Sequence, residues 1–286
     1  MSLAARLGVE KAVILHVDDL AMCHGGNRAY LELAAKGAVT CGSVMVPCPW
    51  FREIAEAAAD PALDLGVHLT LTSEWPHYRW RPLSTTSRAS GLIDEEGYFW
   101  RDVASLRAHL VPEAAESELR AQIDYAIAAG IKPTHIDAHM AAAMLPELID
   151  LHVRLAFDYG LVPVLPRLIR WAPERESYAA SVARLDAAAL PVIDHFRGTL
   201  PVEADAVEQR YRETIEGLQP GITHFALHAT MPGEIETISP QHAGWRIREY
   251  ALFASGAISE WLAPNGIIPI GYRDIQRLWA AQAMHA

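Results

Sequence analysis

The stretch Ala12-Val13-Ile14-Leu15-His16-Val17-Asp18-Asp19 decides the fold, because an apolar, β-branched run ends there in two acidic residues. Similar apolar runs recur along the chain, and longer amphipathic stretches separate them. The strand-like runs fall at 39–46, 65–71, 133–139, 162–165, 192–193, 222–228 and 267–271. Helical stretches are expected at 26–36, 50–59, 113–129, 146–159, 177–189, 204–218, 241–254, 258–262 and 273–283. This alternation is typical of βα units around a parallel sheet.

The chain length and the number of expected strands indicate one α/β barrel. The 286 residues are close to the ~250 residues of a typical single-domain barrel. We therefore expect a single domain over 1–286, with an irregular insertion at about 72–101. That insertion has no hydrophobic period, and loops of this length often bind substrate or act as lids.

The composition excludes several classes of protein. Asp and Glu outnumber Lys and Arg by 35 to 24, giving a net charge of -11, whereas a nucleic-acid surface needs clustered positive charge. The balance favours a neutral or cationic small-molecule substrate. Three cysteines without a CxxC pair favour a reducing compartment. No run approaches the ~20 apolar residues of a membrane span, and no signal-like apolar region opens the chain, so we expect a cytoplasmic protein.

Four of the expected strands end in side chains that bind metal ions. These are Asp18 with Asp19, His68, His139 and His228. Active sites of barrels form at the C-terminal ends of the strands, and an aspartate with two histidines leaves coordination positions open for catalysis. Adjacent residues of a regular strand point to opposite sides, so one aspartate is expected to bind metal and the other to accept a proton from water. The alternative is a solvated turn or helix N-cap, where aspartate is common.

The histidines around the fourth and seventh runs have distinct expected positions. His135, Asp137 and His139 alternate at a spacing of two, so they face one way on a strand. We expect His139 at the mouth and His135 deeper, with Asp137 orienting a ligand imidazole and His135 supporting the ligands from behind. His228 is a candidate general acid for the leaving group. The alternative is a histidine near the mouth without a chemical role.

Aromatic residues gather in the insertion. Trp75, Tyr78 and Trp80 predict a platform for sugar rings, because aromatic faces stack on the apolar faces of sugars. An equally open interpretation is that these rings pack the loop against the barrel.

The ordered motifs at the strand ends resemble those of the YdjC-like carbohydrate deacetylases, also called the ChbG/HpnK family. Val17-Asp18-Asp19-Leu20 is similar to the end of the family's Asn-Ala-Asp-Asp-Phe-Gly element, with His16 in place of the asparagine. Gly66-Val67-His68-Leu69-Thr70-Leu71-Thr72 resembles its Gly-x-His-Leu-x-Leu-Thr element. Thr134-His135-Ile136-Asp137-Ala138-His139 resembles its Thr-His-x-Asp-Ser-His element. The family often has a further histidine where this chain has Ala141.

The resemblance implies a distorted, TIM-like (β/α) barrel of about seven strands, related to the polysaccharide deacetylases. It implies a divalent metal ion, Mg²⁺ or Zn²⁺, bound by Asp19, His68 and His139. It also implies that metal-activated water removes N-acetyl groups from amino sugars such as chitooligosaccharides, with Asp18 as the base.

Two other functions stay open at this point. One is another metal hydrolase, such as a phosphoesterase, although no basic cluster for phosphate is evident in the sequence. The other is a non-catalytic protein of the same fold that binds metal or carbohydrate, which the residue Ala141 favours. The expected partner is a small acylated sugar. The oligomeric state stays open between a monomer and a homodimer, because barrels of this size often dimerise.

Overall fold

A computed structural model of the chain describes residues 2–167, 175–187, 192–198 and 202–283. Its parallel strands form one curled sheet in the order β5-β4-β3-β2-β1-β7-β6, and β8 pairs with β1. The strands are β1 Lys11–Leu20, β2 Cys41–Val44, β3 Leu65–Leu69, β4 His135–Ala138, β5 Val162–Pro163, β6 His195–Gly198, β7 Gly221–Leu227 and β8 Ile267–Pro269.

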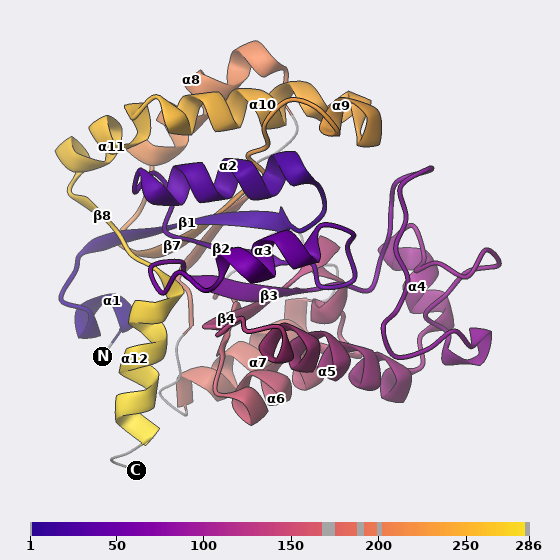
Figure 1. Ribbon diagram of the computed structural model, residues 1–286. Helices are drawn as coiled ribbons and strands as arrows, with labels where there is room; N and C mark the ends of the chain where they lie inside the picture. The colour runs from indigo at the N-terminus through magenta and orange to yellow at the C-terminus, as the bar shows by residue number, and fades with distance from the viewer. Residues whose placement is uncertain (1, 168–174, 188–191, 199–201, 284–286) are drawn as a thin grey trace.

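Helices cover the outside of the curled sheet. Figure 1 shows α2 and α10 on one side of the strands and α5 and α6 on the opposite side. The helices are α1 Leu3–Arg6, α2 His24–Ala35, α3 Phe51–Ala57, α4 Val103–His109, α5 Pro112–Ala128, α6 Ile149–Tyr159, α7 Arg175–Ala187, α8 Val207–Glu216, α9 Ile235–Ile238, α10 Pro240–Ala254, α11 Ala257–Leu262 and α12 Tyr272–Ala283. Among the described helices, none is long and apolar enough to cross a membrane.

The two edges of the sheet approach each other beyond β5 and before β6. Within the described residues, one parallel bridge joins Pro166 to Ile193, and the backbone N–H of Ile193 donates to the carbonyl of Leu165 at 3.2 Å. The sheet therefore curls into a barrel whose two edges meet at this bridge. The fold class expected from the sequence, a distorted α/β barrel of about seven strands, is confirmed.

Strand β1 is the centre of the core because it is paired on both edges. It pairs with β7 along 11–17, and its other edge pairs with β8 at 11–13 and then with β2 from His16 onward. Val13 and Ile14 are fully buried, as expected for an apolar strand covered on both faces. The C-terminal end of this strand is where the polar residues begin.

Four segments differ from the sequence-based expectation. Residues 192–193 form no strand; β6 begins at His195, where pairing with Thr223 of β7 starts, and Ile193 makes only the bridge to Pro166. Helices α1, α4 and α9 were not predicted, since each is only one or two turns long. The segment 72–101 contains one 3₁₀ turn, Arg88–Ser90, and two isolated bridges, and in Figure 1 it extends past the C-terminal ends of the strands.

Candidate active site

A β-bulge at the end of β1 turns two adjacent carboxylates into the same cavity. Val17 is opposite Gly42 and Leu20 is opposite Val44, so β1 takes three steps where β2 takes two. Asp19 adopts a left-handed backbone with φ of 60°, which non-glycine residues rarely do outside functional sites. Asp18 and Asp19 therefore both line the cavity, whereas a regular strand would send them to opposite faces.

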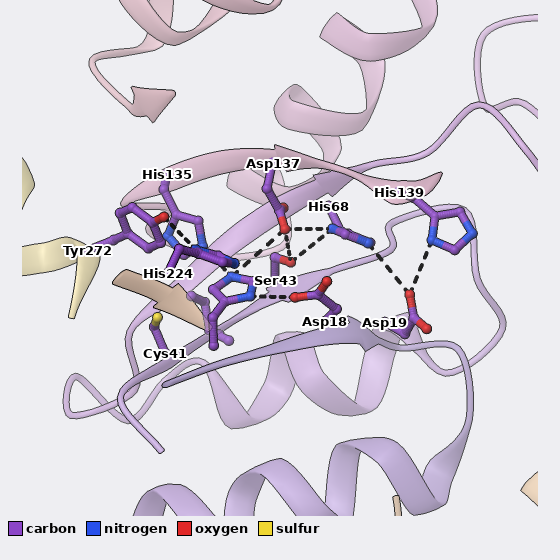
Figure 2. Close-up of polar contacts among 12 residues, drawn as sticks. Asp18, Asp19, Cys41, Ser43, His68, His135, Asp137, His139, His224 and Tyr272 are labelled. Atoms are coloured by element: carbon purple, nitrogen blue, oxygen red, sulfur yellow. Dashed lines mark hydrogen bonds and ion pairs between the residues drawn. The ribbon is translucent and has the colours of Figure 1, made fainter. Parts of the chain in front are cut away.

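The side chains of Asp19, His68 and His139 converge at the mouth of the barrel (Figure 2). Asp19 Oδ1 lies 3.5 Å from His68 Nε2 and 3.2 Å from His139 Nδ1. This oxygen is buried and makes no hydrogen bond among the described residues. Ligand atoms around one divalent ion, each about 2.1 Å from it, lie roughly 3 Å apart. The three residues thus fit a divalent ion.

Further polar side chains hold each member of this cluster in place. His68 Nδ1 lies 2.8 Å from Asp137 Oδ2, and Ser43 donates to the same oxygen at 3.0 Å. Arg246 donates from both terminal nitrogens to Asp19 Oδ2 at 3.1 Å. Histidine ligands commonly donate their second nitrogen to a carboxylate in this way.

The electrostatic environment of the cluster favours a bound positive charge. Burial raises the pKa of Asp19, but its contacts with His139 and His68 outweigh burial and hold that pKa well below the usual range. Burial lowers the pKa of His139, but Glu74 and Asp19 outweigh it and raise the pKa to about 9. The pKa of His68 is likewise raised well above its usual value, chiefly by Asp137, against the effect of burial. A bound cation would replace these protons, because metal ligands must be deprotonated.

Asp18 and His228 lie beside this cluster. Asp18 Oδ1 is 2.6 Å from His16 Nδ1, and its Oδ2 is 4.0 Å from His228 Nε2. Burial raises the pKa of Asp18, but the hydrogen bond to His16 outweighs it, so the pKa lies below the usual value. Burial and then Arg246 lower the pKa of His228 to about 4. At neutral pH Asp18 is therefore ionised and His228 is neutral.

The cavity at this end of the barrel has a volume of about 780 Å³ and joins the polar cluster to apolar walls. Its apolar lining includes Trp75, Met140, Val164, Phe196 and Trp245.

Comparisons with known proteins identify the family of this chain. A family model described as YdjC-like protein matches residues 12–264. The chain belongs to the YdjC-like family. It is 44% identical over 168 residues to a carbohydrate deacetylase of Thermus thermophilus, covering 58% of this chain and 58% of that relative. It is 35% identical over 125 residues to a carbohydrate deacetylase of Brevibacillus brevis, covering 43% of this chain and 47% of that relative.

One relative aligns over nearly its whole length. A carbohydrate deacetylase of Thermoanaerobacter pseudethanolicus is 26% identical over 265 residues, covering 92% of this chain and 98% of the relative. A solved structure described as a putative cellobiose-phosphate cleavage protein from Enterococcus faecalis superposes with a TM-score of 0.77 at 23% identity, covering 93% of this chain and 99% of that chain. At that identity, the similarity shows the fold alone.

The aromatic residues expected to bind substrate occupy different places in this YdjC-like protein. Trp75 lines the cavity. Tyr78 and Trp80 are not among its lining residues. The hydroxyl of Tyr78 donates to the carbonyl of Met22 at 2.5 Å, and the indole of Trp80 donates to the carbonyl of Thr72 at 2.8 Å. These two side chains pack the insertion against the barrel.

Several residues of this YdjC-like site were not predicted from the sequence. Glu74 contacts the second ring nitrogen of His139 at 3.0 Å, and Arg246 contacts Asp19 across 227 positions of the chain. Ser43 and His224 also belong to the polar cluster. Glu74 lies in an irregular segment and Arg246 on a long amphipathic helix, so no local pattern marked either of them.

The two residues expected to support the ligands separate in the structure. Asp137 contacts the imidazole of the expected ligand His68. His135 lies deeper and is fully buried, and its Nε2 lies 2.8 Å from Nε2 of His16 and not beside an expected ligand.

Proposed function

We propose that the protein is a metal-dependent deacetylase that removes N-acetyl groups from amino sugars. The observation that carries this proposal is the buried Asp19 Oδ1, which faces His68 and His139 without a hydrogen bond and lies next to the ionised Asp18. The relatives named carbohydrate deacetylase support the substrate class.

Asp19, His68 and His139 would hold the divalent ion. A ligand set with two imidazoles suits Zn²⁺ better than Mg²⁺, which prefers oxygen ligands. An ion bound there would supply Lewis-acid chemistry, lowering the pKa of water and polarising an acyl oxygen.

Asp18 and His228 would move the protons of the reaction. Asp18 Oδ2 faces His228, and its lowered pKa keeps it ionised, so it can accept a proton from the attacking water. His228 is neutral at rest and needs a proton before it can donate one. Asp18 Oδ2 lies 4.0 Å from His228 Nε2, beyond hydrogen-bond distance, so the proton would pass to His228 through one bridging water molecule. His228 would then protonate the leaving amine. One proton is taken from water and one leaves with the amine, so both residues return to their starting state.

The charge of the cavity supports an amine-releasing reaction over phosphoester cleavage. Among the described lining residues, Arg246 is the one permanently charged cation, and both of its terminal nitrogens donate to Asp19. A phosphate group would meet a guanidinium whose terminal nitrogens already donate to Asp19, whereas the ammonium product of deacetylation suits the acidic lining. Trp75 would stack on the sugar ring.

The test combines metal content with acetate release from N-acetylglucosamine oligomers, for the wild type, Asp18→Asn and His68→Ala. The wild type is expected to bind about one ion per chain and to release acetate. Asp18→Asn should keep the ion and lose roughly 10²- to 10⁴-fold in turnover, because a general base contributes that much. His68→Ala should lose the ion. His77→Ala, which removes an exposed histidine outside the cluster, is the matched control for metal content.

Two results would contradict the proposal. Full turnover in Asp18→Asn would show that Asp18 is not the general base. A wild type that binds the ion and acetylated sugars but releases no acetate would favour the non-catalytic alternative.

A further inference from the structure

A chain of buried polar side chains runs from Asp18 down into the barrel. His16 Nδ1 contacts Asp18 at 2.6 Å, and His16 Nε2 lies 2.8 Å from His135 Nε2. His135 Nδ1 then lies 2.9 Å from the hydroxyl of Thr134, which donates to Asp64 at 2.5 Å. The four residues of this chain other than Asp18 are each at most 5% exposed. In Figure 2, His135 lies at the opposite end of the polar cluster from Asp19.

The packing around His135 is specific to this arrangement. A Cβ at Gly66 would lie 2.4 Å from His135 Nε2, so only glycine leaves room for the ring on β3. The ring of Tyr272 stacks on the other side of His135, with centroids 4.1 Å apart. The imidazole is thus held between two walls, with its nitrogens directed along the chain of contacts.

The number of protons on these groups fixes the direction of each hydrogen bond. If Asp64 is ionised, it can only accept, so Thr134 gives it its one hydroxyl proton and accepts from His135 Nδ1. Burial and the neighbouring His16 lower the pKa of His135 well below the usual value, so its ring carries one proton and Nε2 accepts. His16 must then donate through Nε2.

The opposite arrangement leads to the same contact at Asp18. If Asp64 holds a proton, Thr134 accepts from it and donates to His135 Nδ1, so His135 donates through Nε2 to His16. His16 is then neutral with its proton on Nδ1, facing Asp18. In both arrangements a proton lies between His16 Nδ1 and Asp18 Oδ1, because two acceptors would repel at 2.6 Å.

We propose that His16 is a positioning residue for Asp18, that its Nδ1–H donates to Asp18 Oδ1, and that His135, Thr134 and Asp64 hold the His16 ring in place and set whether its Nε2 donates or accepts. This inference rests on the proposed role of Asp18 as base. The bond from His16 occupies Oδ1, so Asp18 presents Oδ2 to the substrate side, where His228 lies.

The same chain forms a proton relay with Asp64 at its far end. The two arrangements differ by three transfers, from Asp64 to Thr134, from Thr134 to His135 and from His135 to His16. Each group gives one proton and receives one, except that Asp64 loses a proton and His16 gains one. Burial raises the pKa of Asp64, which favours storage of the proton there. The charge beside Asp18 is therefore linked to Asp64, which directly precedes β3.

The kinetic test removes the hydroxyl of Thr134 while keeping its shape. Thr134→Val should lower kcat by about 10- to 100-fold, as loss of an orienting hydrogen bond does in comparable sites, with KM and metal content unchanged. Thr134→Ser should restore most of kcat, because it returns the hydroxyl. Thr223→Val is the matched control, since the hydroxyl of Thr223 is buried and has no hydrogen-bond partner among the residues that the structure describes; its kcat should stay at the wild-type level.

A readout independent of activity is the ¹⁵N spectrum of the histidine rings, with His16 assigned by its loss in His16→Asn. Thr134→Val should shift the His16 ring signals and Thr134→Ser should not.

Unchanged His16 signals and kcat in Thr134→Val, or equal losses of kcat in the Val and Ser variants, would overturn the inference. A second bound ion that is lost in His224→Ala would also overturn the inference. His16, Asp18 and His224 could bind such an ion, and one nitrogen of His16 would then be a metal ligand. If the wild type deacetylates no acetylated sugar, the proposed function fails, and the spectra still decide whether the relay exists.

Discussion

The imidazole of His139 is held on both sides by carboxylates. Glu74 Oε2 lies 3.0 Å from Nε2, and Asp19 Oδ1 lies 3.2 Å from Nδ1. Because Glu74 accepts the Nε2 proton, the lone pair of Nδ1 is left for a metal ion. We predict that Glu74→Ala raises the Kd for the ion by about 10- to 100-fold, measured by calorimetry or by competition with a chelator.

The charge and the hydrogen bond of Glu74 can be separated. Glu74→Gln keeps an oxygen acceptor and loses the charge, so its Kd should fall between those of the wild type and Glu74→Ala. Glu96→Ala removes an exposed carboxylate of the same segment and should leave the Kd unchanged. Equal Kd values in the wild type and Glu74→Ala would remove Glu74 from the site.

At the level of residues, the sequence predicts the polar strand ends but not their outer contacts. Asp19, His68 and His139 each follow an apolar run, and the topology brings such ends together. The approach of Arg246 to Asp19 depends on how α10 packs, and the left-handed backbone of Asp19 depends on the bulge. Neither leaves a local pattern, so neither could be predicted.

Helix α6 contains a buried histidine without a hydrogen bond. Both ring nitrogens of His152 lack a partner among the described residues, and burial lowers its pKa to about 4. Between the ordinary pKa of 6.5 and about 4, the unfolded chain takes up a proton that the folded chain does not. Above this window the effect is absent, and stability is lost as the pH falls through it.

We predict that His152→Leu removes this acid sensitivity. Between pH 7.5 and 4.5, the wild type should lose about 2 to 3 kcal/mol more than the variant, because about two pH units of this range lie below the ordinary pKa of 6.5 and each is worth about 1.36 kcal/mol. The measurement is urea unfolding at both pH values. Parallel losses in the two proteins would show that His152 is hydrated or paired in solution.

At the level of elements, buried strands and helices are easier to predict from the sequence than exposed or short ones. The predicted strands that the structure confirms are apolar runs with clear ends, such as β1 and β7. The strand β6 was misplaced because His195-Phe196-Arg197-Gly198 is half exposed and lacks an apolar pattern. Helix α4 begins with Asp102, which accepts from the backbone N–H of Ser105, but its two turns are too short to show a period.

At the level of the whole molecule, the alternation of strands and helices predicts the barrel but not how its strands pair. Strand β8 occupies half of one edge of β1, and β2 occupies the other half, an arrangement that depends on the curvature of the sheet. The seam at Pro166 and Ile193 also depends on three-dimensional closure. Sequence patterns indicate which residues along the chain are buried. The pairing of β8 and the contact at the seam depend on packing between distant segments, so these patterns do not predict them.

The candidate ligands also connect distant parts of the barrel. Asp19 ends β1, His68 lies in β3 and His139 follows β4, so one ion would tie three strands together at the mouth. Such an ion binds the folded chain and not the unfolded one. At 100 times its Kd, it stabilises the fold by about 2.7 kcal/mol, which corresponds to a rise in Tm of roughly 4 to 5 °C for a chain of this size.

We predict this rise in thermal unfolding of the metal-free wild type after addition of Zn²⁺ or Mg²⁺, and its reversal by a chelator. His68→Ala should show no rise, because the remaining aspartate and histidine bind the ion too weakly. The exposed variant His77→Ala should behave as the wild type does. An equal rise in His68→Ala would place the stabilising ion elsewhere, since removal of one of three ligands cannot leave the affinity of this site unchanged.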